Sequence, residues 1–298
     1  MKLRLALAAA MALTGAAVLA EAAQGPIRLT PLTVTNDEWE RPFAPLKIAG
    51  NLYYVGTYDL GAFLITTPEG HILINSGVAS SVPMIRANVE ALGFKFSDIK
   101  LITATHGHWD HVAGLAEIKR LTGARMLMHE ADVDVVESGG HIDYRRPEGR
   151  GLIYEPLKVD QRLKHGDSFG LGGVALTAHH HPGHTKGATS FTYTTQEAGR
   201  AVSVVIANMG SVNEGTRLLN APGYPAIAQD YAATFARQKQ LRPDVWVASH
   251  AGQFGLHEKY RPGDPYDPSR FSAGWQEAVA RYEKAYLARL EGEKQPAR

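Results

Sequence analysis

The sequence predicts an α/β protein in which two mixed sheets pack face to face with helices outside. Short β-branched or apolar runs, such as residues 62–67 and 202–207, alternate with amphipathic helical patterns in two successive halves of the chain. Neither half carries the glycine pattern of a dinucleotide-binding turn or of a phosphate-binding loop. A four-layer αββα sandwich would bury the apolar side of all these elements.

The elements of the first half follow from two kinds of periodicity. Apolar residues at 82, 85, 89 and 92 share one face of a helix, and Gly93 is of a type that ends helices. Glu69-Gly70 forms a turn between two strands. Strands are expected at 52–57, 62–67, 71–75, 100–105 and 125–128, and helices at 82–92 and 112–121.

The second half repeats this organisation. Ile227, Tyr231 and Phe235 recur at four-residue steps of one helix, and a longer amphipathic helix is expected from Trp275 to Leu290. Residues 139–156 lack periodicity and are rich in Gly, Pro and Arg, so we predict a long surface loop, either a lid or a solvated excursion. Strands are expected at 174–178, 190–194, 202–207 and 245–248.

Length and charge limit the classes of protein to consider. The chain has 298 residues, is 44% hydrophobic and carries a formal net charge of +1, which fits a globular protein of one large or two small domains. Because no basic cluster is interleaved with aromatic residues, we expect no nucleic-acid partner. No apolar stripe is left over for a partner subunit, so a monomer is the default expectation.

The first residues have the pattern of an export signal. Lys2 and Arg4 precede an almost wholly apolar stretch that ends at Leu19, and Ala20-Glu21-Ala22 offers small residues where a signal peptidase cleaves. The alternative is a membrane anchor, but about 15 apolar residues are short for a hydrocarbon layer of about 30 Å. We expect a signal peptide at 1–22, an extended arm at 23–45 and the folded domain at 46–298, in a periplasmic or secreted protein without stable membrane association.

The segment Thr-His-Gly-His-Trp-Asp-His at 105–111 carries the strongest chemical signal. Imidazole nitrogen and carboxylate oxygen are ligands of zinc besides thiolate, and the chain has no cysteine. His106 and His108 lie on the same side of an extended segment and could bind one ion. Asp110 and His111 follow at the turn into a helix and could serve a second ion. Asp110 could alternatively be the N-cap of that helix.

Zinc needs more ligands than this loop offers, and other histidines are the candidates. His250 follows a predicted strand, as His106 does. His184 follows a Pro-Gly turn that lets it project from its loop, and we favour it. Three neighbours compete with His184, although at most two of them can face the site because they alternate between the sides of a strand: His179, His180 and His181.

Together these motifs resemble those of a known superfamily. The segment 105–111 is similar to the H-x-H-x-D-H signature of the metallo-β-lactamase superfamily, and Pro-Gly-His-Thr at 182–185 and Ser-His-Ala-Gly at 249–252 are similar to its later metal motifs. The strand–turn segment 69–77 also resembles the superfamily. The resemblance covers about residues 44–290 and implies the αββα sandwich of metallo-β-lactamase type and a zinc-dependent hydrolase.

Within the superfamily, the chain resembles the third subclass of class B β-lactamases. Many other hydrolases of the superfamily carry a bridging Asp, and two lactamase subclasses a Cys, in the stretch that corresponds to residues 205–213, which contains neither. The resemblance implies two Zn²⁺ ions. One would be held by His106, His108 and His184, and the other by Asp110, His111 and His250.

The resemblance also implies a substrate site beside the metal ions. Trp39 and the 139–156 loop would shape an apolar wall. Many members of the subclass have Ser near the position of Met209, whereas this chain has Ser only at 211. The expected contacts of the substrate carboxylate are therefore Ser211 and the loop residues Asn213 or Lys186.

The implied activity is opening of the β-lactam ring of penicillins, cephalosporins and carbapenems, which confers antibiotic resistance. Zinc lowers the pKa of its bound water to about 7, so hydroxide would attack the carbonyl carbon at neutral pH. The three-histidine zinc would polarise the carbonyl oxygen, and the zinc bound by Asp110 would receive the leaving nitrogen. Asp110 is the expected catalytic residue, because it would orient the hydroxide and relay its proton.

Three other functions stay open at this point. A lactonase or thioesterase of the superfamily would turn over homoserine lactones or glutathione thioesters faster than β-lactams, but the missing bridging Asp argues against it. A non-enzymatic, exported zinc-binding protein would need no open coordination position. A nuclease of the superfamily is disfavoured because the chain lacks a basic patch.

Overall fold

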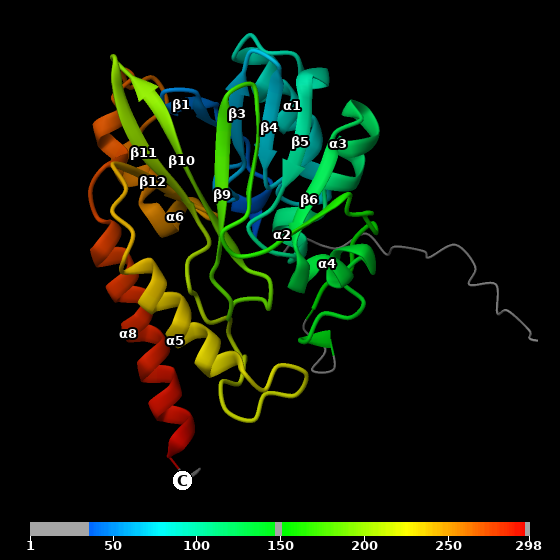
Figure 1. Ribbon diagram of the computed structural model, residues 1–298, viewed down its shortest axis with the longest axis vertical. Coiled ribbons are helices and arrows are strands. Elements are labelled where there is room, and N and C mark those ends of the chain that lie inside the picture. Colours follow the sequence, from blue (N-terminus) through cyan, green and yellow to red (C-terminus); the bar gives the residue numbers. More distant parts are fainter. Residues whose placement is uncertain (1–35, 147–150, 296–298) are drawn as a thin grey trace, which may run out of the picture. The chain divides into compact units, whose positions relative to one another are not determined.

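The computed structural model describes residues 36–146 and 151–295 (Figure 1). The predicted signal peptide and most of the predicted arm lie outside these residues. The described end of the arm differs from the expected extended chain, because it contains the 3-10 helix η1 (Asp37–Trp39) and the buried residue Phe43. Within the described ranges, we find no helix that combines the length and the hydropathy needed to cross a membrane.

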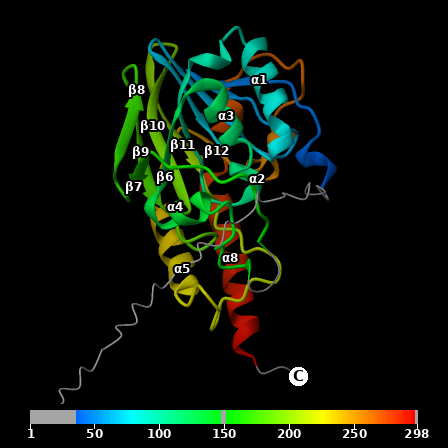
Figure 2. The same cartoon turned by 90° about the vertical axis from the view of Figure 1, so that its right-hand side faces the viewer.

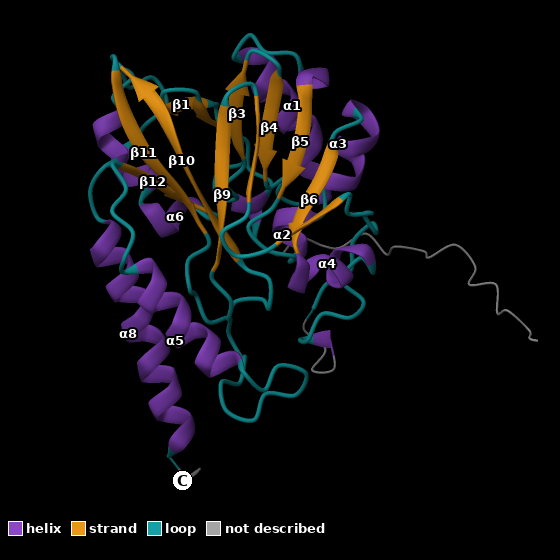
Figure 3. Ribbon diagram, viewed as in Figure 1, coloured by secondary structure: helices purple, strands orange, loops and turns teal. Residues whose placement is uncertain are grey.

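Two mixed sheets form the centre of the structure (Figure 3). The seven strands of the first sheet lie side by side in chain order; neighbours are antiparallel from β1 to β4 and parallel from β4 to β7. Its strands are β1 (Leu46–Ala49), β2 (Leu52–Tyr54), β3 (Phe63–Thr67), β4 (Gly70–Ile74), β5 (Ile99–Thr103), β6 (Arg125–His129) and β7 (Gln161–Leu163).

The second sheet has five strands in the order β12-β11-β10-β9-β8. All its neighbours are antiparallel except β11 and β12, which are parallel. Its strands are β8 (Ser168–Leu171), β9 (Val174–His180), β10 (Thr189–Glu197), β11 (Arg200–Ala207) and β12 (Val245–Ala248).

Helices cover the outer faces of both sheets, which confirms the expected αββα layers (Figures 1 and 2). The first sheet is covered by α1 (Val82–Ala91), α3 (Leu115–Thr122) and α4 (Glu130–Glu137), and the second by α5 (Ile227–Gln238) and α8 (Trp275–Lys294). Shorter helices are η2 (Ala79–Ser81), η3 (Phe96–Asp98), α2 (Trp109–Val112), α6 (Ala251–Phe254), α7 (Leu256–Lys259) and η5 (Pro268–Phe271).

The alternation of side chains along β3 and β4 explains how one sheet supports two cores. Phe63 and Ile72 belong to the core between the sheets, which also contains Phe191 of the second sheet. The intervening residues Leu64 and Leu73 belong to the core beneath the helices of the first sheet. Since successive side chains of a strand point to opposite faces, strands buried on both sides are apolar throughout.

One predicted helix is wrong in a way that matters for the site. The expected helix 112–121 is two helices, α2 and α3, separated at Gly114, whose amide donates to Ser76 Oγ at 3.0 Å. A Cβ on Gly114 would come within 2.8 Å of the Val82 side chain, so the close packing with α1 requires glycine. Because α2 begins at Trp109 and its N-cap is His108, the alternative role of Asp110 as N-cap is excluded.

The loop 139–156 is only partly the surface loop that we expected. Its described residues form no regular strand, and Ile142 is exposed. Tyr154 is buried, however, and its hydroxyl donates to the carbonyl of Gly107 at 2.7 Å. This end of the loop is therefore packed against the 105–111 segment, which excludes a solvated excursion there. Strands β1, β7 and β8 and helix α4 had not been predicted, because they are short or weakly periodic.

Candidate metal centre

Loops from both sheets meet at one end of the sandwich. The first follows β5 and leads into α2, which lies beyond the ends of β5 and β6 (Figure 1). The second joins β9 to β10 and carries His184, and the third follows β12 and carries His250. All six predicted ligands lie on these three loops or on α2.

His106, His108 and His184 form a compact cluster, here called the three-histidine group. Their ligand nitrogens all lie within 4.8 Å of one another, and His108 Nδ1 is 3.1 Å from His184 Nε2. The three side chains are buried. Nε2 of His106 has no hydrogen-bond partner, although an unpaired buried nitrogen is costly unless a ligand satisfies it.

The outer nitrogen of each ring in this group faces an oxygen atom. His184 Nδ1 lies 2.8 Å from the carbonyl oxygen of Ser211, which can only accept, so Nδ1 donates and Nε2 keeps its lone pair. His106 Nδ1 is 3.2 Å from the Thr105 hydroxyl, and His108 Nε2 is 3.6 Å from Asp143 Oδ2. Such outer contacts orient metal-binding imidazoles.

Burial keeps the three rings neutral. It holds the pKa of His106 and of His108 well below the usual value, and it lowers the pKa of His184 to about 4. Neighbouring imidazoles add to the lowering at His106 and His108. Neutral imidazole is the form that binds a metal ion, so the group is ready for one at neutral pH.

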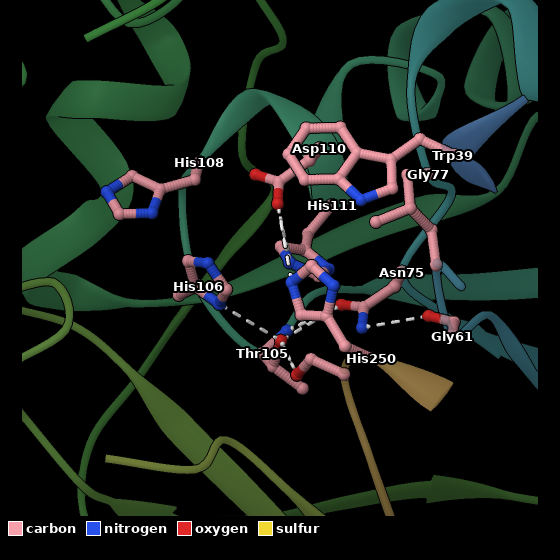
Figure 4. A network of polar contacts seen from close by, with 12 residues as sticks. Trp39, Gly61, Asn75, Gly77, Thr105, His106, His108, Asp110, His111 and His250 are labelled. Carbon is pink, nitrogen blue, oxygen red and sulfur yellow. Dashed lines mark hydrogen bonds and ion pairs between the residues drawn. The ribbon is translucent and has the colours of Figure 1, made fainter. Parts of the chain in front are cut away.

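Asp110, His111 and His250 form the second cluster, here called the aspartate group (Figure 4). Asp110 Oδ2 is 3.2 Å from His111 Nε2 and 3.5 Å from His250 Nε2. Neither ring nitrogen of the buried His111 has a hydrogen-bond partner. His106 lies close to this cluster too, because its ligand nitrogen, a carboxylate oxygen of Asp110 and the ligand nitrogen of His111 fall within 4.8 Å of one another.

Asp59 supports the aspartate group from outside. Its Oδ2 accepts from His250 Nδ1 at 2.8 Å and from Trp39 Nε1 at 3.1 Å. Burial favours a neutral His250, but the hydrogen bonds to Asp110 and Asp59 outweigh it and raise the pKa of His250 to about 9. Burial likewise opposes the charge of Asp110, yet His111 and His250 hold the pKa of that carboxyl well below its usual value.

A hydrogen-bond network joins the loops beneath both clusters (Figure 4). Asn75, which adopts a positive φ of 66°, accepts from the Thr105 amide at 2.9 Å and donates to the Gly61 carbonyl at 3.2 Å. The Thr105 hydroxyl is 2.9 Å from the hydroxyl of Ser249. Thr105 and Ser249 directly precede His106 and His250, so this network sets the distance between the two clusters.

Asp132 on α4 joins the two loops of the three-histidine group. It accepts from the amide of Gly107 at 2.9 Å, from the Thr185 hydroxyl at 2.6 Å and from the amide of Gly187 at 2.7 Å. Burial raises the pKa of Asp132, and these hydrogen bonds oppose the rise. Nothing in the local sequence marks Asp132, because its partners lie 25, 53 and 55 residues away.

The histidines that compete with His184 have partners elsewhere. His179 Nε2 is 2.7 Å from the Thr192 hydroxyl, and His181 Nδ1 is 2.8 Å from that of Ser190. His180 stacks on His129, and its Nε2 lies 2.8 Å from the Lys186 carbonyl. The structure therefore places His184 beside His106 and His108. The three competing histidines have other partners.

The residues predicted to contact the substrate differ in where they lie relative to the proposed metal ligands. The Trp39 ring is 6.0 Å from that of His250 and 5.4 Å from that of Trp109, which extends an aromatic wall. The Ser211 hydroxyl lies 3.3 Å from His184 Nδ1. The backbone carbonyl of Asn213 accepts from Thr216 at 3.1 Å, and the Lys186 ammonium lies over the Tyr224 ring at 5.6 Å.

The donor set fits a metal ion that prefers nitrogen with a little oxygen. Five imidazoles and one carboxylate converge, four ring nitrogens among them are buried without a hydrogen-bond partner, and the chain offers no thiolate. Such a set is typical of zinc. The αββα fold and this histidine-rich centre together define a metal-binding protein of the superfamily that the motifs resemble.

The chain belongs to the metallo-beta-lactamase superfamily, whose family model matches residues 62–250. This confirms the expected family. Solved structures are similar over almost the whole of their chains. The metallo-beta-lactamase GOB-18 from Elizabethkingia meningoseptica is 44% identical, with 89% of this chain and 98% of that chain covered and a TM-score of 0.85. The class B3 di-zinc metallo-beta-lactamase LRA-12 from an Alaskan soil metagenome is 43% identical, with 87% and 98% covered and a TM-score of 0.83.

Curated relatives are more distant and have other activities. A hydroxyacylglutathione hydrolase of Hyphomonas neptunium is 30% identical over 131 residues, which are 44% of this chain and 42% of that protein. The N-acyl homoserine lactonase AttM of Azorhizobium caulinodans is 30% identical over 164 residues, 46% of this chain and 60% of that protein. The chain spans about half the length of the curated relatives that it matches.

Proposed function

We propose that this protein is a hydrolase with two zinc ions that opens the ring of β-lactam antibiotics. The observation that carries the proposal is the pair of clusters on the 105–111 loop, in a chain 43–44% identical over 87–89% of its length to metallo-beta-lactamases. His106, His108 and His184 would hold one ion, and Asp110, His111 and His250 the other. Bound zinc supplies a Lewis acid that polarises a carbonyl group and lowers the pKa of water.

The residues of the chain position the reaction and handle its protons. The carbonyl of Ser211 and the carboxylate of Asp59 fix the rings of His184 and His250, so that Nε2 of each faces inward. Asp110 stays ionised, so its Oδ2 can accept a hydrogen bond that orients a nucleophilic water. Trp39 and Trp109 form an apolar wall beside the aspartate group, which suits the hydrophobic side groups of bicyclic β-lactams.

A lactonase or thioesterase is the second candidate, because curated relatives have these activities. The stretch 205–213 argues against it. In the place of a carboxylate it presents the buried side chains of Asn208 and Met209, and the carbonyl of Asn208 accepts from Gln238 at 2.8 Å. We therefore expect β-lactams to be turned over faster than lactones or thioesters.

One assay panel tests this proposal. The purified protein is given a penicillin, a cephalosporin, a carbapenem, an acyl-homoserine lactone and a glutathione thioester, each with and without EDTA, and zinc is counted by mass spectrometry. We expect about two zinc ions per chain, and β-lactam hydrolysis that EDTA abolishes and zinc restores. Activity that survives chelation, or faster turnover of the lactone or thioester, would overturn the proposal; a flat panel with bound zinc would favour a non-enzymatic zinc-binding protein.

We also infer that the protein is exported to the periplasm or secreted and acts as a monomer. Export is supported by the basic, apolar and small-residue pattern of residues 1–22. Cell fractionation of the full chain and sizing of the mature protein test these two points.

A further inference from the structure

The segment 143–145 lies directly against the three-histidine group. Asp143 is buried, and its Oδ2 is 3.6 Å from His108 Nε2. The hydroxyl of Tyr144 donates to the backbone carbonyl of His184 at 3.3 Å. The amide of Arg145 donates to Asp143 Oδ1 at 2.8 Å, a local turn that fixes the backbone of Arg145 beside these contacts. Two successive residues thus touch two proposed ligands, and the third brings an arginine to the same place.

The half-buried side chain of Arg145 has an unpaired nitrogen. Its Nε is buried without a hydrogen-bond partner, and no carboxylate in the described parts of the chain forms an ion pair with it. The charge of Arg145 opposes the rise in the pKa of Asp143 that burial causes, but the oxygens of Asp143 are directed to the Arg145 amide and to His108. A partly buried guanidinium without a partner is unfavourable, which points to a ligand as the missing partner.

The positive charge of Arg145 acts on two of the proposed ligands. After burial, which is the main cause, Arg145 contributes to the low pKa of both His108 and His184. It also opposes the rise in the pKa of Tyr231 that burial causes, and the hydroxyl of Tyr231 donates to the Ser211 carbonyl at 2.8 Å. Together with the contacts of Asp143 and Tyr144, these effects indicate that the charge of Arg145 lies near the three-histidine group.

Two other basic side chains nearby, those of Arg146 and Lys186, have contacts of their own. Arg146 turns away, because its Nη1 donates to the Gly151 carbonyl at 2.6 Å, and Lys186 lies over the Tyr224 ring. The Ser211 hydroxyl oxygen lies 3.3 Å from His184 Nδ1, where it can only accept because Nδ1 carries the proton. Among the described basic residues named here, Arg145 thus keeps a guanidinium nitrogen without a hydrogen-bond partner, and two zinc ions nearby would make its positive charge still less favourable.

We propose that Arg145 is a specificity-determining residue that binds the carboxylate of the substrate. A planar guanidinium forms paired hydrogen bonds with a carboxylate, and bicyclic β-lactams carry a carboxylate next to the ring nitrogen. Binding there would pair the guanidinium with an anion and direct the lactam carbonyl toward the zinc pair. This inference rests on the proposed function and replaces Ser211, Asn213 and Lys186 as the main carboxylate contact.

Matched substrates and matched variants test it. Steady-state kinetics are measured on a cephalosporin and on its methyl ester, with the wild type, Arg145→Ala, Arg145→Lys and Arg146→Ala. For the acid, Arg145→Ala should raise KM about 10- to 100-fold, the range of one hydrogen bond to a charged group, with kcat changed less than about threefold. Arg145→Lys should fall between, because lysine keeps the charge but not the paired geometry.

The ester separates carboxylate binding from general damage. Arg145→Ala should leave KM for the ester unchanged, and Arg146→Ala should leave both substrates unchanged, with zinc content and melting temperature equal in all variants. Equal effects of Arg145→Ala on acid and ester, or no effect on either, would overturn the role of Arg145 while the proposed function stands. A wild type that opens neither substrate would overturn both.

Discussion

The three-histidine group and the aspartate group differ in what lies behind their ligands. Behind the three-histidine group are neutral oxygens, the Ser211 carbonyl and the Thr105 hydroxyl, with Asp143 farther away at 3.6 Å. Burial then prevails, and the rings are neutral. Behind His250 of the aspartate group is a carboxylate, Asp59, and in front of it is another, Asp110.

This difference shows how one loop can supply two sites of unequal character. The three-histidine group can accept an ion without releasing a proton. In the aspartate group, His250 lies between two carboxylates with a pKa of about 9, so an ion has to displace a proton there. We therefore expect the first site to bind zinc more tightly at neutral pH and the second to depend on pH.

The largest expected effect is loss of the three-histidine group. His184→Ala removes a ligand and should lower β-lactam kcat/KM by more than about 100-fold, beyond the range for residues that only orient ligands. Zinc content should fall toward one ion. His180→Ala, a matched change four residues away, should keep activity and zinc, because His180 contacts the Lys186 carbonyl and His129 instead. The reverse result would mean that the loop presents another histidine.

The pH dependence of zinc binding compares the two groups directly. Because the pKa of His250 is raised to about 9, the ring is protonated below that pH, and the affinity for the second ion should rise about tenfold per pH unit up to pH 9. The affinity for the ion in the three-histidine group should not change between pH 6 and 8, since the pKa of His184 is about 4. Zinc titration against a chromophoric chelator at pH 6, 7 and 8 measures both. The same pH dependence of zinc affinity in both groups would contradict the expected difference between them.

Asp59→Asn tests the carboxylate behind His250. The change removes the charge that fixes and polarises the ring, so affinity for the second ion should fall about 10- to 100-fold while the first constant stays the same. The pH range over which the affinity for the second zinc ion rises should also shift to lower values, because His250 loses a charged acceptor. Trp39→Phe is the control: it removes the hydrogen bond from Trp39 to Asp59 but keeps the contact of Asp59 with His250, so both zinc affinities should stay the same. An unchanged second constant in Asp59→Asn would refute the role of Asp59.

Asp132→Asn has the smallest expected effect and tests the scaffold of the three-histidine group. Both carboxylate oxygens of Asp132 accept hydrogen bonds, from three donors in all, whereas an asparagine has only one side-chain oxygen. At least one donor would lose its acceptor, so we expect the free energy of unfolding to fall by about 1–3 kcal/mol. Urea unfolding of the zinc-loaded protein measures it. Asp134→Asn on the same helix should change stability by less than about 0.5 kcal/mol, since Asp134 forms an exposed ion pair with Arg162 at 3.3 Å.

Periodicity was enough to predict most of the sandwich. The strands β3, β4, β9 and β11 and the helices α1, α5 and α8 lie close to their expected positions, because each has a long apolar pattern. The break between α2 and α3 was not predictable, because it depends on the contact of Gly114 with Ser76 and Val82 across the sheet edge. Strand β7 has only three residues, too few for a periodic signal.

By itself, the sequence determined the family, the order of the layers and the candidate ligands, because these depend on residue type and on spacing along the chain. Only the tertiary structure decided which other residues contact and orient each proposed ligand. Asp59 reaches His250 across 191 residues, Asp132 reaches Gly187 across 55, and Tyr144 reaches the His184 carbonyl from a loop without periodicity. Such contacts form when distant strands pair and their loops converge, so they set the charge and orientation of each ligand without leaving a local pattern in the sequence.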